Sequence, residues 1–457
     1  MSRLAIGWCM AIGLGYWGKA AAQAPTLTIG SGNIATEVSL DLNTFSAPCL
    51  LSVAPYVKVR APLGFSPVAV PLNKIRISVV SIDGVNLLGA GTEQILSTTD
   101  GTVYSALAGL LGTTGTVNVR YRIPVTEMTN YAWSAGTNTT DLIFTTPGST
   151  LCLGSITFTR TLSLVIQPFL TVPATTNLTL SVNNLNYFRN TTVSGSQNIM
   201  ATTTIAHGIR LKTGAATFAF TNGYSGATDP LTNVNKVQAQ ITGQSAINLG
   251  NTLQDLTPAG GFAVITGNAK TSQVGFSITP ANLKANFIKK GTYTANLGYE
   301  VYDARASPTV ATTTLTPTLV VDVADMGEIA VNNAAVNLNF NATSSYINGV
   351  AVEMPGHLTV SKTTAYSVTV KANGPSLANG TNTLPIGILT IGPATGQTGV
   401  NTITLTETAQ KIIDGASPEI DRSVGLKFSV PAAKVPQLMN KPAGDYSVTL
   451  TYTLTAP

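Results

Sequence analysis

The feature that most constrains the fold is a phrase that the chain contains twice. "GTYTANLGYEV" occupies residues 291–301 and "GDYSVTLTYTL" occupies residues 444–454. In both copies apolar residues alternate with polar ones, and successive side chains of a strand point to opposite faces of a sheet. The phrase therefore predicts a strand of an antiparallel sheet that has one buried face and one solvent-exposed face.

Other segments extend this duplication in the same order. The matching pairs are residues 177–182 with 335–340, 207–223 with 357–374, and 274–283 with 424–435. The second pair aligns His207 with His357 at the start of a strand. We therefore interpret residues 172–323 and 324–457 as two copies of one domain.

Residues 23–171 are predicted to be a third, diverged copy. "IRISVVSIDG" at residues 75–84 fits the strand that ends in Asn-Gly, and "TVNVRYRIPV" at 116–125 fits the strand that ends at proline. "ITFTRTLSLVI" at residues 156–166 fits the opening phrase, although it lacks the Gly-x-Tyr start.

The predicted fold class is all-β, built from tandem Ig-like antiparallel β-sandwich domains that follow a signal peptide. Short alternating strands recur between turns of Gly, Asn and Pro, as expected for two packed sheets. Charged residues make up only 10% of the chain. Its polarity comes instead from Thr, which favours strands, and from Asn and Gly, which favour turns. Residues 280–289 are the one helical candidate, expected to form a single turn.

The first residues are predicted to be a signal peptide, residues 1–22. Arg3 precedes the apolar stretch "LAIGWCMAIGLGYWG", and Ala20, Ala21 and Ala22 form a small-residue cleavage signal. The apolar stretch is short for a membrane-spanning helix, which needs about 20 residues. We expect an exported protein of the periplasm, cell surface or extracellular space, with no transmembrane segment after cleavage.

Two cysteines, Cys49 and Cys152, lie outside the predicted signal peptide. An exported chain meets an oxidising compartment, so an even number of cysteines favours a disulfide between them. The alternative is two separate buried thiols.

No catalytic, cofactor-binding or metal-binding motif is recognised, so we expect no enzyme activity, no cofactor and no metal. The matched placement of His207 and His357 favours a structural role. The densest acidic group, "DVADMGE" at residues 322–328, is interpreted as a solvated linker, with a Ca²⁺ site as the alternative. The formal net charge of +5 comes from scattered basic residues, which excludes a nucleic-acid-binding stripe.

Tyr131 and Trp133 belong to the loop "NYAWSAG" and are the candidate ligand-contact residues. If both rings are exposed, they form a platform for a sugar or a protein partner. The alternative is an aromatic anchor that fixes the loop onto its sandwich.

The chain resembles bacterial pilin-like surface proteins, namely chaperone–usher fimbrial subunits and the spore coat protein U group. The resemblance rests on the closing strand "AGDYSVTLTYTL", its earlier copy, and the Thr- and Asn-rich composition. It implies a non-enzymatic structural fibre component or adhesin, with other envelope or fimbrial subunits or a surface glycan as partners. The alternatives are an array of carbohydrate-binding modules and, less favoured, a secreted hydrolase.

The last unit is predicted to lack one strand. "TLTPTLVVDV" at residues 314–323 alternates and is expected to close the second sandwich, but nothing equivalent follows residues 444–454. Unpaired backbone at a sheet edge invites a strand from another chain, which is how the proteins that this chain resembles assemble. The segment "APTLTIGSG" at residues 24–32 is a candidate donor. The alternative is that a strand near residues 329–331 of the same unit fills the gap.

Overall fold

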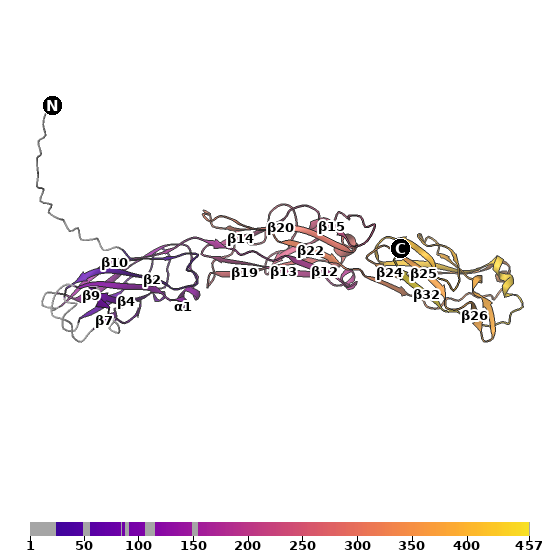
Figure 1. The fold of residues 1–457 in the computed structure, drawn as a ribbon, viewed down its shortest axis with the longest axis horizontal. Helices are drawn as coiled ribbons and strands as arrows, with labels where there is room; N and C mark the ends of the chain where they lie inside the picture. Colours follow the sequence, from indigo (N-terminus) through magenta and orange to yellow (C-terminus); the bar gives the residue numbers. More distant parts are fainter. Residues whose placement is uncertain are drawn as a thin grey trace, which may run out of the picture.

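A computed structural model describes residues 24–48, 55–83, 85–86, 91–105, 115–148 and 154–456. Three β-sandwiches lie end to end along the molecule, and the chain passes through them in sequence order (Figure 1). The predicted all-β fold class is confirmed. The sandwiches are named N-terminal, middle and C-terminal, while the domain limits given above stay a prediction.

The N-terminal sandwich packs the sheet β1-β10-β9-β3-β7 against the sheet β2-β8-β4-β5, with β6 beside β4. Its first strand runs parallel to β10, and β10 runs antiparallel to β9. Its elements are β1 (Thr26–Ile29), β2 (Val38–Ala47), β3 (Tyr56–Arg60), η1 (Leu72–Lys74), β4 (Arg76–Ile82), β5 (Val85–Asn86), β6 (Gln94–Ile95), β7 (Gly101–Ser105), β8 (Gly115–Ile123), α1 (Val125–Thr129), β9 (Gly136–Pro147) and β10 (Ser155–Ile166).

The middle sandwich packs the sheet β11-β13-β19-β16-β17 against the sheet β12-β22-β20-β14-β18, in which β15 and β21 also pair with β20. Its elements are β11 (Leu170–Thr171), β12 (Leu178–Val182), α2 (Asn186–Arg189), β13 (Val193–Thr203), β14 (His207–Thr213), β15 (Ala219–Asn222), η2 (Val234–Lys236), β16 (Gln238–Ile241), β17 (Ile247–Asn248), β18 (Gln254–Asp255), β19 (Ala269–Ile278), α3 (Pro280–Asn286), β20 (Gly291–Asp303), β21 (Thr313–Leu315) and β22 (Thr318–Val323).

The C-terminal sandwich packs the sheet β23-β24-β31-β28-β29 against the three-stranded sheet β30-β25-β32. Its elements are β23 (Gly327–Val331), α4 (Thr343–Asn348), β24 (Gly349–Lys362), β25 (Tyr366–Ala372), β26 (Ser376–Asn379), β27 (Asn382–Pro385), η3 (Ile386–Ile388), β28 (Thr390–Pro393), β29 (Ile403–Thr404), β30 (Gln410–Ala416), β31 (Glu419–Pro431), η4 (Ala432–Leu438) and β32 (Leu450–Thr455).

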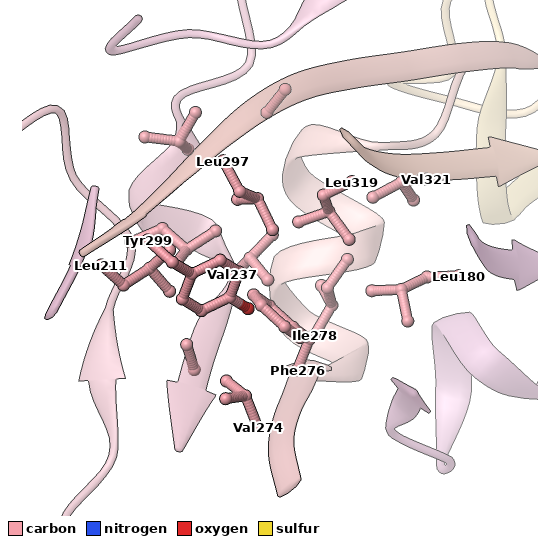
Figure 2. Close-up of a cluster of buried hydrophobic side chains, with 14 of the residues drawn as sticks. Leu180, Leu211, Val237, Val274, Phe276, Ile278, Leu297, Tyr299, Leu319 and Val321 are labelled. Carbon is pink, nitrogen blue, oxygen red and sulfur yellow. The ribbon is translucent and has the colours of Figure 1, made fainter. Parts of the chain in front are cut away.

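The predicted extra strand closes the middle sandwich. β22 lies between β12, to which it is parallel, and the first half of β20, to which it is antiparallel. Leu319, Val321 and Val323 are buried, whereas Asp322 is exposed. In Figure 2, Leu319 and Val321 of β22 lie in the same core as Leu297 of β20 and Ile278 of β19. The alternation read from the sequence therefore has the correct parity.

Strand pairing corrects two assignments made for the N-terminal region. The strand that takes the place of β20 is β9, which begins at Gly136, and not residues 156–166. Residues 156–166 form β10, which holds the closing position that β22 holds in the middle sandwich. Residues 75–84 contain β4, which pairs with β8, whereas the segment ending in Asn-Gly contains β15, which pairs with β20. Residues 116–125 were assigned correctly, since β8 lies between β2 and β4 as β19 lies between β13 and β16.

The helical candidate forms a longer helix than expected. α3 spans 7 residues, about two turns rather than one. Thr279 caps it by accepting a hydrogen bond from the Asn282 N–H, and Pro280 occupies the first turn, where its missing N–H is not needed. Leu283 and Phe287 anchor the helix in the core.

Candidate functional site

The C-terminal sandwich has an open sheet edge along β32. In the middle sandwich, β20 has neighbours on both sides: β14 and β15 on one edge, β21 and β22 on the other. β32 pairs with β25 on one edge. Among the residues that the structure describes, no strand pairs with its other edge.

Two segments beside this edge have lost their strand structure. Residues 333–341 correspond to β12, and residues 444–449 correspond to the first half of β20. Both counterparts in the middle sandwich pair with β22. The segment at 444–449 keeps one isolated bridge, between Ser447 and Ala378. Because an extended backbone needs a hydrogen-bonding neighbour, the absence of one shared strand explains why both segments are irregular.

The apolar side chains along the edge are correspondingly less buried. In β20 the inward residues are buried, with Tyr293, Tyr299 and Val301 at 0% exposure. Their counterparts are only half-buried: Tyr446, Val448, Leu450, Tyr452 and Leu454. Val336, Leu338 and Phe340, from the other segment, are also half-buried and pack against the same two hydrophobic clusters as these residues. We call the position between residues 335–340 and 444–456, which corresponds to the position of β21 and β22 in the middle sandwich, the strand groove.

The intramolecular alternative is wrong for the described residues. β23, which contains Ile329, pairs with β24 in the opposite sheet and not with β32. β23 only approaches the near end of the edge, where Gly327, Glu328 and Lys362 line a trough together with residues 452–456. The edge of β32 is therefore left available.

A groove of this kind is suited to binding an extended peptide. It offers a row of unpaired backbone N–H and C=O groups beside a row of apolar side chains that repeat every second residue. These two features are what strand addition to a sheet uses: the backbone supplies affinity and alternate side chains supply specificity. The groove is therefore the candidate functional site.

The proposed donor at residues 24–32 is already in use. Thr26–Ile29 forms β1, which pairs with β10 of its own sandwich, and Leu27 and Ile29 are buried at 1% and 0% exposure. Releasing this strand would uncover both side chains and one edge of β10. The suggestion that this segment donates itself to another chain is therefore wrong for this structure.

Tyr131 and Trp133 do not form an exposed platform. Trp133 is completely buried, and its indole N–H donates to the Met128 carbonyl at 3.1 Å. Tyr131 is half-buried and meets Trp133 edge-on, with ring centroids 4.8 Å apart. The condition for a glycan platform, joint exposure of the two rings, is not met. The loop instead joins the N-terminal and middle sandwiches, because the side-chain amide of Asn268 exchanges two hydrogen bonds with the Trp133 backbone.

The two histidines are not equivalent, contrary to the sequence alignment. His207 begins β14, which pairs with β20, whereas His357 lies on β24, which pairs with β31. The strand that takes the place of β14 is β25. Both side chains are buried. Burial and the nearby Lys270 lower the pKa of His207 to about 4, and burial lowers the pKa of His357.

The acidic segment at residues 322–328 forms ion pairs with both of the sandwiches that it connects. Asp325 lies between Lys290 and Lys362, and Glu328 pairs with Arg189. Lys362, and to a lesser extent Lys290, lower the pKa of Asp325. Within the described ranges, no group of three or more His, Cys, Asp or Glu side chains is arranged to hold a metal ion. The segment is therefore a charged junction rather than a solvated linker.

Other sequence predictions fall outside the described residues. The signal peptide, residues 1–22, and both cysteines, Cys49 and Cys152, are among them. In the part of the chain that the structure describes, no helix is long and apolar enough to span a bilayer.

Sequence analysis identified residues 444–454 as one side of the strand groove but did not identify residues 335–340 as the other side. The phrase at residues 444–454 was recognised as a strand lacking a neighbour. Residues 335–340 were matched to residues 177–182, but their own loss of a partner was not foreseen. The sequence offered no signal for it, because the pairing of both middle-sandwich segments with the same strand, β22, is seen only in the structure.

Comparison by sequence finds no matching family model and no matching curated protein. Solved structures with a similar fold include a chaperone–tip adhesin subunit complex from archaic chaperone-usher Csu pili of Acinetobacter baumannii (15% identity, covering 63% of this chain and 99% of that chain, TM-score 0.33). A mutant of the CFA/I adhesin of enterotoxigenic Escherichia coli has 11% identity, with coverage of 66% and 99% and a TM-score of 0.28. A tip adhesin of Pseudomonas aeruginosa has 12% identity, with coverage of 63% and 88% and a TM-score of 0.25.

Proposed function

We propose that this chain is a non-enzymatic subunit of a bacterial surface fibre, structural or adhesive, whose C-terminal sandwich receives a strand from a neighbouring subunit. The observation that carries the proposal is the strand groove: β32 lacks a neighbour on one edge, and the apolar side chains along it are half-buried. Export through the predicted signal peptide and a disulfide between Cys49 and Cys152 belong to the same proposal.

β22 of the middle sandwich is the template for an occupant of the groove. A strand in that position runs parallel to residues 335–340 and antiparallel to residues 444–449, and places an apolar side chain inward at every second residue. Full burial of each such side chain contributes about 1.5–3 kcal/mol. The backbone of the incoming strand would restore the hydrogen bonding that both irregular segments lack.

The position of β1 limits what this chain can give to a neighbouring subunit. The C-terminal sandwich offers a groove, while β1 is held by β10 and is not free to enter the groove of another subunit. β1 is therefore not the strand that this chain would pass to a neighbouring subunit. A carbohydrate-binding array is not favoured, because Trp133 is buried.

A synthetic peptide of residues 312–323 tests the groove in the full-length chain. The middle sandwich already contains this strand, so the empty position lies in the C-terminal sandwich. We expect the peptide to slow hydrogen exchange at residues 444–455 and to raise the melting temperature of the C-terminal sandwich. The control is the same peptide carrying Leu319→Asp and Val321→Asp, which cannot bury its inward face. Equal exchange rates with both peptides would contradict the proposal.

A further inference from the structure

The short connections that lead into β9 and β20 contact the next sandwich along the chain. We define the entry connections as residues 130–135 before β9, 287–290 before β20, and 439–443 before the phrase that begins at Gly444. At the first junction, the Ala135 N–H donates to the Thr204 carbonyl at 2.8 Å. Thr204 lies in the turn between β13 and β14 of the middle sandwich.

The second junction repeats this contact. The Lys290 N–H donates to the Thr363 carbonyl at 2.8 Å, and Thr363 lies in the turn between β24 and β25. Ala135 and Lys290 hold the same position, because each directly precedes the glycine that begins its strand, β9 or β20. Gly136 and Gly291 share an unusual backbone angle, with φ of 156° and 141°, which glycine adopts readily. The same donor position thus meets the same turn in two junctions.

A second pair of contacts also corresponds between the junctions. Asn268 and Asp421, at the start of β19 and within β31, both have left-handed backbone angles, with φ of 57° and 58°. Asn268 bonds to the Trp133 backbone of the preceding sandwich. Asp421 accepts hydrogen bonds from Arg189 at 2.9 Å and from Lys284 at 3.4 Å, which also belong to the preceding sandwich. The receiving surface is therefore the same region in both cases, although its side chains differ.

The third entry connection has the same local construction, and none of the described residues of another sandwich contacts it. Gly444 has φ of 149°, and the Tyr446 hydroxyl donates to the Pro442 carbonyl at 2.9 Å. The Tyr293 hydroxyl donates in the same way to the Lys289 carbonyl at 3.0 Å. Ala443 is exposed, and its N–H has no hydrogen-bond partner among the described residues.

We propose that residues 439–443 form a third junction surface, which docks the β-sandwich of the next fibre subunit. The Ala443 N–H would donate to a carbonyl in the turn of that sandwich that corresponds to the β13–β14 and β24–β25 turns. Met439, in the same connection, is exposed. The connection leads directly into the strand groove. The donated strand and the docked sandwich of the next subunit would therefore contact one continuous surface. This inference rests on the proposed function, because the docked sandwich belongs to the subunit that supplies the strand.

An extended version of the full-length chain tests the junction with a known partner. The long extension adds a second copy of residues 304–457 after Ala456, which supplies a closing strand and a following sandwich with its own Thr363. The short extension adds a copy of residues 304–323 alone, which supplies the strand without the sandwich. Because the long version contains Ala443 and residues 446–454 twice, only the original copy carries an isotope label, and amide hydrogen exchange is measured at these residues of that copy. The Lys290 amide, whose junction is present in every version, is the internal control.

Both extensions are expected to protect residues 446–454, and only the long one to slow exchange at Ala443, by about tenfold or more. If the long extension protects residues 446–454 and leaves Ala443 as fast as in the short one, the junction surface is disproved while the groove stands. If neither extension protects residues 446–454, the proposed function itself fails.

Discussion

Phe45 and Phe158 stack in the N-terminal sandwich, with their ring centroids 4.7 Å apart and their planes inclined by 15°. Phe45 lies near the end of β2 and Phe158 near the start of β10. The Arg160 guanidinium fixes the same contact by donating to the Thr44 carbonyl at 2.8 Å. The chain leaving β2 and the chain entering β10 therefore meet at the same end of the sandwich.

This relationship supports the predicted disulfide, since Cys49 follows Phe45 and Cys152 precedes Phe158 by a few residues. We expect alkylation of the unfolded, unreduced mature protein to label neither cysteine. Reduction should lower the stability of the N-terminal sandwich by up to about 4–5 kcal/mol in the chain-entropy model, because the bond closes a long loop. Labelling of both cysteines before reduction would show that the thiols are free.

Truncation of two equivalent tyrosines should have unequal effects. Tyr293 is fully buried and Tyr446 is half-buried, although both begin the same phrase. We expect Tyr293→Ala to destabilise the middle sandwich by about 3–5 kcal/mol, as for other large buried side chains. Tyr446→Ala should reduce the unfolding free energy of the C-terminal sandwich by clearly less in the chain without added peptide. Both losses are measured by urea unfolding, followed by hydrogen exchange in peptides from each sandwich. Saturation with the peptide of residues 312–323 should bring the two costs closer together. Equal costs in the free chain would mean that the groove is already filled.

His207 should make the middle sandwich sensitive to acid. Its pKa is about 4 in the folded protein and near 6.5 when unfolded, so the unfolded chain binds more protons between these values. Stability is thus retained above pH 6.5 and lost as the pH falls towards 4, by up to about 3 kcal/mol. The charged groups facing this histidine are Lys270 and Asp303, which pairs with Arg305.

The control for this acid sensitivity is His207→Phe, which removes the titrating ring while keeping an aromatic group beside Phe262. Hydrogen exchange of β14 at pH 7 and pH 4.5 should show a smaller pH dependence in the variant than in the wild type. An unchanged pH dependence would assign the effect to other groups.

The two junctions should respond differently to salt. Asn268 joins the first two sandwiches through neutral hydrogen bonds, whereas Asp421 joins the second pair through Arg189 and Lys284. Because screening weakens exposed ion pairs, 1 M salt should increase motion at the second junction and leave the first unchanged. Distances between fluorophores placed on adjacent sandwiches would measure this.

Asp421→Asn should reproduce the effect of salt on the second junction at low ionic strength. Asn268→Ala should loosen the first junction at any salt concentration, because it leaves the Trp133 N–H without its acceptor. A second junction that stays rigid both in 1 M salt and in the Asp421→Asn variant would show that Ile420, which packs into the middle core, holds it instead.

The sequence by itself determined most of the strands and which face of each is buried, although residues 335–340 and 444–449 alternate in the same way and are irregular. Alternation is a local property with a period of two residues, so it needs no knowledge of the partner strand. Tyr293, Leu297 and Tyr299 are buried as the pattern predicts, and so are Leu319 and Val321. The same reasoning identified residues 314–323 as a closing strand without any structural information.

Only the tertiary structure decided which strand pairs with which. Every alternating strand resembles every other, so a repeat read from alternation is easily aligned one strand out of place. That is why His207 and His357 were matched although they lie on β14 and β24, which belong to opposite sheets. The sequence of a strand likewise does not indicate whether a neighbouring strand covers its side chains. Tyr299 is enclosed and Tyr452 is half-buried because β21 and β22 cover the edge of β20, while the edge of β32 is uncovered.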